Sequence, residues 1–357
     1  MGEVVLKLKG VCKEFPGVKA LDGVDLEVRE GEVMALLGEN GAGKSTLMKC
    51  LTGVYQRDAG SIQFRGKEIN YTNARQAQDD GISIIHQELN LIPKMKVYEN
   101  IFLGRELKNK MGKIDIKQMY NKTAEMLKSM NVDLKPDQKI CELSVAQQQM
   151  VEIAKALLLD TKVIVMDEPT DALTDSEVVS LFKIINDLRD RKKAVVYISH
   201  RLEELSHIVD RVTIMRDGQY ITDGNFKDMD MDYIIKNMVG REIKEKFPRV
   251  ECRKGKKIFE VKNLNAGKMV RDINFSLYEG EIVGFAGLMG AGRTETTRAI
   301  FGVDPKDSGE FYVDGKKIEV NCPMDAIRNG VVLAPEDRKK DGLCTKLSIR
   351  QNLALPN

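Results

Sequence analysis

The sequence predicts an α/β protein built around a mainly parallel sheet, and three observations lead to this prediction. Short apolar runs alternate with longer polar or helical stretches, as in strands joined by helical crossovers. A glycine-rich segment, Gly38–Thr46, lies between one such run and the start of a helix. Its pattern returns later in the chain at a constant offset, which indicates an internal repeat. We therefore expect one α/β domain followed by part of a second copy.

The apolar runs are the expected strands of the first copy. They cover residues 4–8, 33–37, 81–85, 163–166, 194–198 and 212–215. Residues 88–158 show little strand character, and the stretches 116–130 and 146–159 have helical periodicity, so we expect an inserted helical subdomain there. Active loops of parallel sheets gather at the carboxyl ends of the strands, so functional side chains are expected directly after these runs.

Residues 38–45 fit the phosphate-binding loop pattern GxxxxGK[ST] without a mismatch. Glycines in such a loop turn backbone N–H groups toward phosphates, the lysine faces the β and γ oxygens, and the hydroxyl is placed for Mg²⁺. Here Lys44 and Ser45 hold those two positions. The residues predicted to bind a nucleoside triphosphate are Gly38, Glu39, Asn40, Gly41, Ala42, Gly43, Lys44, Ser45 and Thr46.

Four further polar residues follow predicted strands. Asp167 can hold Mg²⁺ directly or through water, and Glu168 can orient or deprotonate a water aimed at the γ-phosphate. The Gln87 amide can reach Mg²⁺ or that water, and the His200 imidazole can reach the γ-phosphate. Each would be an ordinary strand-end residue by itself. Beside a phosphate loop, they predict a hydrolytic site.

The segment Leu143–Gln149 precedes a predicted helix rich in Met, Ile and Ala. Its Ser144 can cap the backbone donors of that helix, or it can form part of an anion site. The second role requires another phosphate loop to face it. Both possibilities stay open at this stage.

Composition excludes several classes of function. The chain has 357 residues and a formal net charge of +2, with no field that favours nucleic acid, and its basic cluster 253–257 has the character of a linker. The 6 cysteines form no CxxC pair or metal-binding cluster, which suits a reducing cytosol. No apolar run approaches the roughly 18 residues that a membrane-spanning helix needs. A role at a membrane would therefore require a partner.

The phosphate loop, Gln87, the 143–149 segment, the Asp167–Glu168 pair and His200 occur in the order of an ATP-binding cassette (ABC) ATPase. The chain resembles the ATPase subunits of bacterial monosaccharide importers, ribose importers among them, with two cassettes in tandem. The strings that carry this resemblance cover residues 14–21, 85–93, 167–174, 199–204 and 335–343.

The resemblance implies an ATP hydrolase that uses ATP and Mg²⁺. Phe15 would stack on adenine, although it could instead be a core aromatic beside Pro16. Ser144 and Gln147 would belong to the cassette signature that contacts nucleotide. The resemblance assigns Mg²⁺ to Ser45, Gln87 and Asp167, the catalytic base to Glu168 and a γ-phosphate switch to His200.

The resemblance also implies partners and a location. The partners would be an integral membrane sugar permease, a periplasmic or lipid-anchored sugar-binding protein reached through it, and a cassette dimer, with no nucleic acid. The protein would lie peripherally at the cytoplasmic face of the bacterial cell membrane. The apolar segment 88–98 would receive a helix of the permease, unless Leu89, Leu91 and Ile92 are simply core residues of the helical subdomain.

We expect a first cassette over residues 1–240, a linker over 241–257 and the N-terminal part of a degenerate second cassette over 258–357. At an offset of 249, Arg293 replaces Lys44 and Glu295 replaces Thr46, while Glu336 replaces Gln87 and Leu264 replaces Phe15. In the first copy, Val145 and Ala146 replace the two glycines of the usual LSGGQ signature. These departures predict one hydrolytic site and one regulatory or structural site.

Other interpretations remain. The second copy has neither its own signature nor an Asp-Glu strand by residue 357, so the chain could bind nucleotide without efficient turnover. The transported sugar could be galactose or xylose. A soluble ABC protein that acts on nucleic acid or ribosomes would be expected to carry two intact phosphate loops and a long charged linker, which this sequence lacks. A kinase would not need the 143–149 segment.

Overall fold

The computed structural model describes residues 2–87, 89–158, 161–170, 173–240, 255–287, 290–335 and 341–355. The chain divides into two compact units, residues 1–244 and 245–357. The division falls within the expected linker 241–257, of which only residues 255–257 are described, and the domain limits stay a prediction.

Unit 1 contains a parallel-type sheet that confirms the predicted α/β class. Four of its strand pairs are parallel, and β10 alone joins the sheet antiparallel, against β9. The six strands, in their order across the sheet, are β10 (Gln219–Asn225), β9 (Arg211–Arg216), β3 (Val33–Leu37), β8 (Ala194–Ile198), β7 (Val163–Asp167) and β6 (Ile82–Ile85). All six predicted apolar runs contain strand, and the runs 33–37 and 194–198 have the predicted bounds.

A second, antiparallel sheet covers one face of the first, and the sequence did not predict it. Its order is β2-β1-β4-β5, with bounds β2 (Val18–Arg29), β1 (Val4–Phe15), β4 (Ala59–Phe64) and β5 (Lys67–Glu68). The predicted strand 4–8 is the first part of β1, whose later residues are partly polar and bulged against both neighbours.

The five parallel strands of the six-stranded sheet are buried on both faces, and their side chains alternate between two cores, whereas β10 is exposed or half-buried. Val33, Ala35 and Leu37 of β3 lie in one apolar cluster. This cluster also contains side chains from helices on the face of the sheet opposite the antiparallel sheet. Met34 and Leu36 lie in the other, with side chains from the antiparallel sheet. This two-residue alternation is the expected geometry of a strand, and burial on both faces explains the continuous apolar runs.

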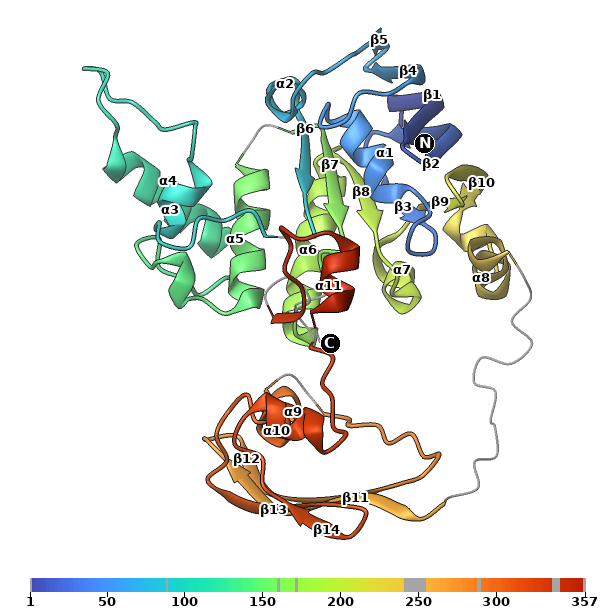
Figure 1. The fold of residues 1–357 in the computed structure, drawn as a ribbon. Coiled ribbons are helices and arrows are strands. Elements are labelled where there is room, and N and C mark those ends of the chain that lie inside the picture. Colours follow the sequence, from blue (N-terminus) through green and yellow to red (C-terminus); the bar gives the residue numbers. More distant parts are fainter. Residues whose placement is uncertain are drawn as a thin grey trace. The chain divides into compact units, whose positions relative to one another are not determined.

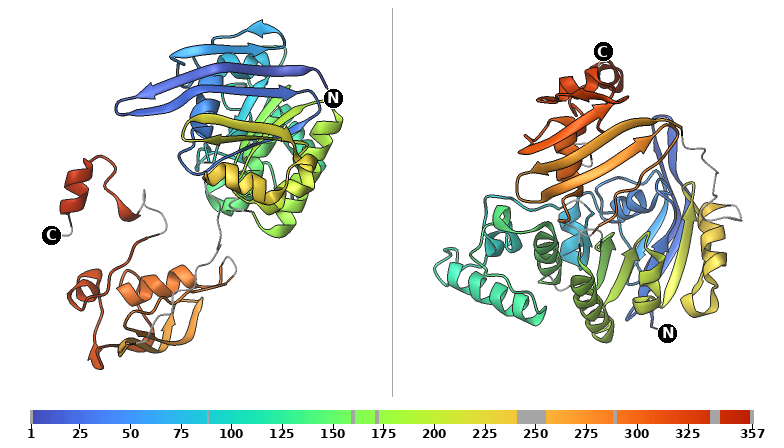
Figure 2. Two further views of the ribbon diagram at one scale, coloured as in Figure 1. Left: turned by 90° about the vertical axis from the view of Figure 1, so that its right-hand side faces the viewer. Right: turned by 90° about the horizontal axis from the view of Figure 1, so that it is seen from below.

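Helices cover the sheet and form a separate group at one side of unit 1 (Figures 1 and 2). Those associated with the sheets are α1 (Lys44–Leu51), α2 (Ala74–Asp80), α6 (Asp175–Asp190), α7 (Leu202–Ile208), η2 (Phe226–Asp228) and α8 (Met231–Val239). The separate group, within the expected helical subdomain 88–158, is α3 (Val97–Ile101), α4 (Ile116–Ser129), η1 (Ile140–Glu142) and α5 (Val145–Leu157). No helix of the described ranges has the length and apolar character to cross a bilayer.

Unit 2 repeats the local order of unit 1. Its elements are β11 (Lys257–Ala266), β12 (Val270–Tyr278), α9 (Arg293–Phe301), β13 (Ser308–Val313), β14 (Lys316–Ile318), α10 (Pro323–Arg328) and α11 (Ile349–Ala354). The sheet order β12-β11-β13-β14 matches β2-β1-β4-β5, and β13 starts and ends 249 residues after β4. The part of unit 2 that the structure describes has no strand at 282–286, where β3 would recur, and Ile282 there is 96% exposed.

Leu36→Ala tests whether β3 holds the two-faced core together. Leu36 is fully buried, so we expect a loss of about 3 kcal/mol of unfolding free energy, from lost transfer energy plus a cavity. Leu103→Ala removes the same atoms at a position that is 45% exposed and should cost under about 1 kcal/mol. Urea denaturation of the two variants measures both values. Equal losses would contradict the burial described for β3.

Candidate nucleotide site

The candidate site lies at the carboxyl ends of neighbouring strands, as predicted. Strand pairing aligns Ile85 with Met166 and Asp167 with Ile198. Gln87, Glu168 and His200 follow those strand ends by one or two residues, so the ladder brings them together. The phosphate loop enters the same edge, because β3 lies next to β8.

The phosphate loop is held close to the backbone of its neighbours. A Cβ on Gly38 would lie 2.3 Å from the carbonyl oxygen of Met215. Gly43 has a φ of +95°, and a Cβ there would lie 2.6 Å from the carbonyl oxygen of Ala20. Only glycine fits either position without a shift of backbone. Gly43 is also the N-cap of α1, which begins at Lys44.

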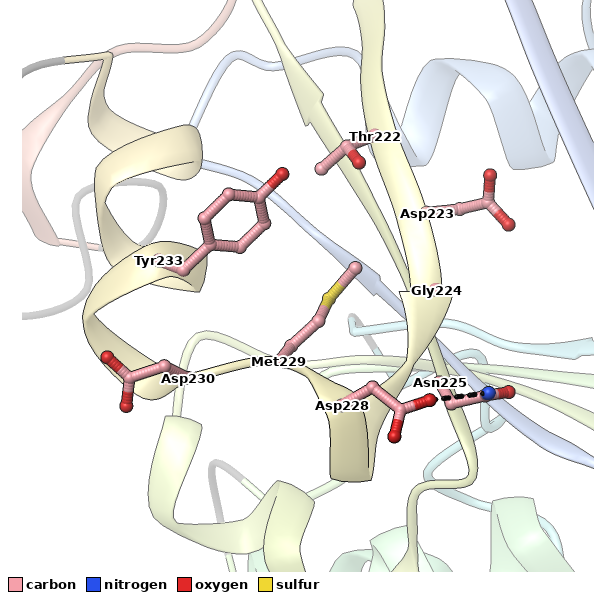
Figure 3. Close-up of a pocket in the computed structure, with 8 residues that line it drawn as sticks. All are labelled: Thr222, Asp223, Gly224, Asn225, Asp228, Met229, Asp230 and Tyr233. Carbon is pink, nitrogen blue, oxygen red and sulfur yellow. Dashed lines mark hydrogen bonds between the residues drawn. The ribbon is translucent and has the colours of Figure 1, made fainter.

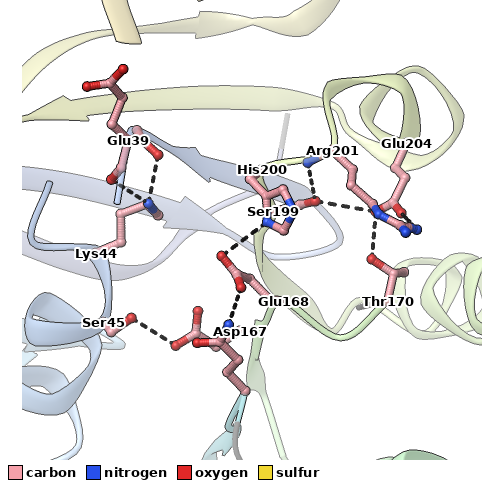
Figure 4. Close-up of polar contacts among 12 residues, drawn as sticks. Glu39, Lys44, Ser45, Asp167, Glu168, Thr170, Ser199, His200, Arg201 and Glu204 are labelled. Atoms are coloured by element: carbon pink, nitrogen blue, oxygen red, sulfur yellow. Dashed lines mark hydrogen bonds and ion pairs between the residues drawn. The ribbon is translucent and has the colours of Figure 1, made fainter. Parts of the chain in front are cut away.

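Lys44 turns its ammonium group into the loop, which leaves its charge partly satisfied by backbone. Nζ donates to the carbonyl oxygens of Gly38 at 2.7 Å and Glu39 at 3.0 Å (Figure 4). The remaining predicted loop residues surround it: Asn40, Gly41 and Ser45 are exposed, Thr46 is half-buried and Ala42 is buried. Carbonyl acceptors of this kind are weaker partners than phosphate oxygens, so the loop has a cation available for an anionic ligand.

Ser45 and Asp167 form a pair beside that cation. Ser45 Oγ donates to Asp167 Oδ2 at 3.0 Å, across 122 positions of sequence (Figure 4). Burial raises the pKa of Asp167, against the hydrogen bond from Ser45 and the charge of Lys44. Burial likewise lowers the pKa of Lys44, against the charges of Glu168 and Asp167. Both groups therefore lack part of their hydration, which favours a ligand that carries both an anion and a metal.

The oxygen set at this point suits Mg²⁺. A hydroxyl and one carboxylate, completed by phosphate oxygens and water, are a usual magnesium environment in nucleotide sites. Within the described ranges, no group of three or more His, Cys, Asp or Glu side chains could hold a metal without other ligands.

Glu168 is held between Gln87 and His200. Gln87 Nε2 donates to Glu168 Oε2. His200 Nδ1 lies 3.3 Å from Glu168 Oε1 (Figure 4). We name this three-residue group the clasp. The Glu168 side chain is 11% exposed and that of His200 is 55% exposed. The imidazole therefore extends toward solvent, while the carboxylate is largely shielded from water.

The backbone of Glu168 is in the left-handed region, with a φ of +49°. A non-glycine residue pays about 1–2 kcal/mol for this conformation, and such residues concentrate at functional sites. The amide of Glu168 donates to the carbonyl oxygen of Ile198 at 2.9 Å, which ties the strained residue to β8. The carboxylate of this strained residue lies between Gln87 and His200.

Ser144 and Gln147 form a reciprocal capping box at the start of α5. Ser144 Oγ accepts from the Gln147 amide at 3.2 Å, and Gln147 Oε1 accepts from the Ser144 amide at 2.9 Å. Capping accounts for both residues locally. Their predicted contact with a nucleotide on another cassette stays a prediction.

Phe15 ends β1 and is half-buried rather than enclosed in the core. Its ring packs edge-on against Tyr55, with a centroid distance of 5.2 Å, and Lys13 Nζ lies 5.5 Å from its centroid. The role of this ring in stacking on adenine stays a prediction.

The equivalent features of unit 2 are partly described. Gly292 has a φ of +84° and caps α9, as Gly43 caps α1, and Arg293 opens that helix. Leu264 is fully buried, consistent with a packing role at the position of Phe15. Glu336 lies outside the described residues, as do Leu288 and Met289 of the second loop.

The segment 88–98 contains both a residue that packs in the core and an exposed apolar residue. Of the apolar residues in 88–98, Leu91 packs partly buried against the main core, as a core residue of the helical subdomain would, whereas Ile92 is 41% exposed.

A cavity of about 530 Å³ lies elsewhere in unit 1, between β10 and α8 (Figure 3). No predicted site residue lines that cavity.

Sequence reasoning missed a buried polar cluster next to the clasp, formed by Glu204, Thr170 and Tyr197. Glu204, on α7, is 8% exposed and accepts hydrogen bonds from Thr170 Oγ1 at 2.9 Å and Tyr197 OH at 2.7 Å. The signal available in the sequence is an acid one turn after His200, adjacent to the apolar Leu205 that faces the core. An acid in that position points inward and needs donors.

Comparison with known proteins gives a consistent result. A family model described as "ABC transporter" matches residues 21–171 and 270–354. The crystal structure of a nucleotide-free ATP-binding cassette from an ABC transporter superimposes with a TM-score of 0.59 at 27% identity, over 69% of this chain and 100% of that chain. An ATP-binding cassette in its ADP conformation gives 0.57 at 29% identity, over 66% and 95%. The protein cbiO1 from Clostridium perfringens, described as part of the ABC transporter complex cbiONQ, gives 0.55 at 27% identity, over 67% and 95%.

The strained backbone at Glu168 can be tested by comparing two substitutions. Glu168→Gly should be more stable than Glu168→Ala by about 1 kcal/mol, because glycine adopts a φ of +49° without the Cβ penalty. The same pair at Glu203, an exposed helical residue of α7, should show the opposite order by about 1 kcal/mol. Urea unfolding of the four variants gives both differences, and the same sign at the two positions would refute the strain.

Proposed function

The chain belongs to the ABC transporter family, and from this premise we propose that it is the ATP-hydrolysing subunit of a monosaccharide importer of the ribose type. ATP binding and hydrolysis would be coupled to an integral membrane permease. The observation that supports hydrolysis best is the clasp, because it holds a carboxylate beside a phosphate loop and between two polar side chains.

Binding of the triphosphate follows from the charges of the loop. Lys44 would exchange its two carbonyl acceptors for β and γ oxygens, which are stronger partners. Ser45 and Asp167 would hold Mg²⁺, with Gln87 as a further ligand. Bound there, the metal would neutralise developing charge on the phosphate oxygens. Phe15 would stack on adenine, and Ser144 with Gln147 would contact the nucleotide of an opposed cassette.

Hydrolysis needs a base next to the attacking water. Glu168 would accept the proton of that water, while Gln87 and His200 fix the carboxylate in position. When both ring nitrogens of His200 carry a proton, Nδ1 can donate to Glu168 while the outward Nε2 donates to a γ-phosphate oxygen. His200 would thereby report the presence of that phosphate to the base.

The assignment to sugar import rests on the resemblance of the strings at 14–21, 85–93, 167–174, 199–204 and 335–343. It implies a location at the cytoplasmic face of the bacterial cell membrane and an indirect link to a sugar-binding protein. Galactose and xylose are alternative cargoes. Identification of the sugar that stimulates ATP turnover by the chain with its permease and binding protein would decide among them.

Unit 2 would be a second, degenerate cassette that does not hydrolyse efficiently. The repeated element order and the matching helix cap at Gly292 support a common ancestry with unit 1. Arginine at position 293 cannot reproduce the compact charge that Lys44 offers to phosphates. Nucleotide at such a site would regulate or support the structure.

Glu168→Gln tests the proposed function. The variant should retain ATP affinity within about twofold and lose phosphate release by about 100-fold or more, because an amide accepts no proton. Glu203→Gln, an exposed acid on α7, is the matched control and should behave as the unaltered protein. Near-normal turnover by Glu168→Gln would reassign the base. Absence of turnover in the unaltered protein would support the alternative of a nucleotide-binding protein that does not hydrolyse efficiently.

The asymmetry of the two loops predicts unequal effects of their cations. Lys44→Ala should weaken ATP binding by about 100-fold, whereas Arg293→Ala should keep most of the affinity and turnover. Titration with a fluorescent ATP analogue measures affinity, and phosphate release measures turnover. Equal losses in the two variants would contradict a degenerate second site.

A further inference from the structure

We propose that Glu204 is a positioning residue for hydrolysis: its buried carboxylate fixes the segment that carries Glu168 against the segment that carries His200. This inference deepens the proposed function and rests on it. The described hydrogen bonds of Glu204 go to Thr170, Tyr197, Ser199 and Arg201, none of which is a predicted nucleotide contact. Glu204 would act through the two members of the clasp that it holds in register.

The Glu204 carboxylate collects donors from three different elements of unit 1. Oε2 accepts from Thr170 Oγ1 at 2.9 Å and, more weakly, from Ser199 Oγ at 3.4 Å (Figure 4). It also accepts from Tyr197 OH at 2.7 Å. Oε1 accepts from Arg201 at 3.2 Å. Thr170 follows β7, and Tyr197 lies in β8. Ser199 comes directly after β8, and Arg201 directly precedes α7.

Each of the four described contacts to this carboxylate comes from a hydrogen-bond donor, and the contact from Arg201 is also an ion pair, at 3.2 Å. Thr170 and Tyr197 are fully buried, and burial together with the negative charge of Glu204 raises the pKa of the Tyr197 hydroxyl, which therefore remains protonated and donates. Burying a charge costs free energy that an apolar side chain of similar size would avoid. A charge retained at that cost calls for a role beyond packing.

The donors stand directly beside the clasp in sequence. Thr170 comes two residues after Glu168, while Ser199 and Arg201 flank His200 on both sides. Ser199 Oγ also accepts from the Arg201 amide at 2.9 Å, which closes the turn around His200. One carboxylate thus restrains both ends of the contact between Glu168 and His200.

The contacts of Glu204 help to hold the strained backbone of Glu168 in its left-handed conformation. A left-handed residue persists when its surroundings fix it on both sides. On one side, the Glu168 amide bonds to Ile198. On the other side, the nearest side-chain anchor to the main body of the sheet is Thr170, through Glu204. Loss of that anchor would let the segment relax and the catalytic carboxylate move.

The test compares ATP turnover of Glu204→Gln and Thr170→Val with that of Glu203→Gln. Glu203 neighbours Glu204 on α7 but is exposed, so its variant controls for charge and helix content. We expect kcat to fall about 10- to 100-fold in the first two variants, because small misplacements of catalytic groups have effects of this size. KM for ATP and the nucleotide Kd should change by less than about threefold.

A second measurement separates positioning from general damage. In a Glu168→Gln background, adding Thr170→Val should change single-turnover hydrolysis by less than about twofold, since the base that Thr170 positions is already lost. A multiplicative loss in the double variant would overturn the proposal, as would unchanged kcat in both single variants. If Glu204→Gln fails to fold, Thr170→Val and Ser199→Ala, which each remove one donor, carry the test.

These outcomes also separate this inference from the proposed function. Turnover that is lost in Glu168→Gln but unaffected by the Glu204 and Thr170 variants would leave the function standing and overturn the inference alone. No turnover by the unaltered protein, in the presence of Mg²⁺ and ATP, would overturn both.

Discussion

The parallel ladder β6-β7-β8-β3 is the constraint on which the rest of unit 1 depends. Side chains of these strands alternate between two separate cores, so each strand is committed to one register. A slip of one residue would send every buried side chain to the wrong face. The same register places the residues that follow each strand side by side, and it therefore determines the site as well as the core.

The precision of the site comes from side-chain contacts beyond the ladder. Strand pairing brings Glu168 and His200 near one another, but it leaves the loops after the strands to be fixed by other means. Buried polar groups supply that fixation: Asp167 is tied to Ser45, and Glu204 to Thr170. Such groups lose hydration, so they tolerate few alternative arrangements. A protein that holds a residue such as Glu168 in a strained conformation gains structural specificity from partners of this kind.

Sequence reasoning predicted the parts that depend on local pattern. Residues 33–37 and 194–198 are predicted with their observed bounds, because continuous burial makes them continuously apolar. The full length of β1 was missed, since most of its later side chains are exposed or only half-buried and bulges interrupt its alternation. Phosphate-loop spacing identified candidate ligands, but a left-handed φ at Glu168 and the convergence of donors on Glu204 arise from tertiary contacts that no short motif encodes.

Unit 2 shows, within the same chain, which structure forms from local sequence pattern and which needs tertiary contacts. Its antiparallel strands β11 to β14 and its helix cap at Gly292 form in the same order as in unit 1. Two of the strand pairs, β11 with β12 and β13 with β14, are hairpins, which depend on nearby sequence. Residues 282–286 align with β3 and are apolar, yet no strand of the described part of unit 2 pairs with them, and Ile282 stays exposed. Val33, the aligned residue, is fully buried between β8 and β9. An apolar run thus becomes a central parallel strand only when distant strands flank it, so the chemistry assembled at the ends of those strands is a property of the whole sheet.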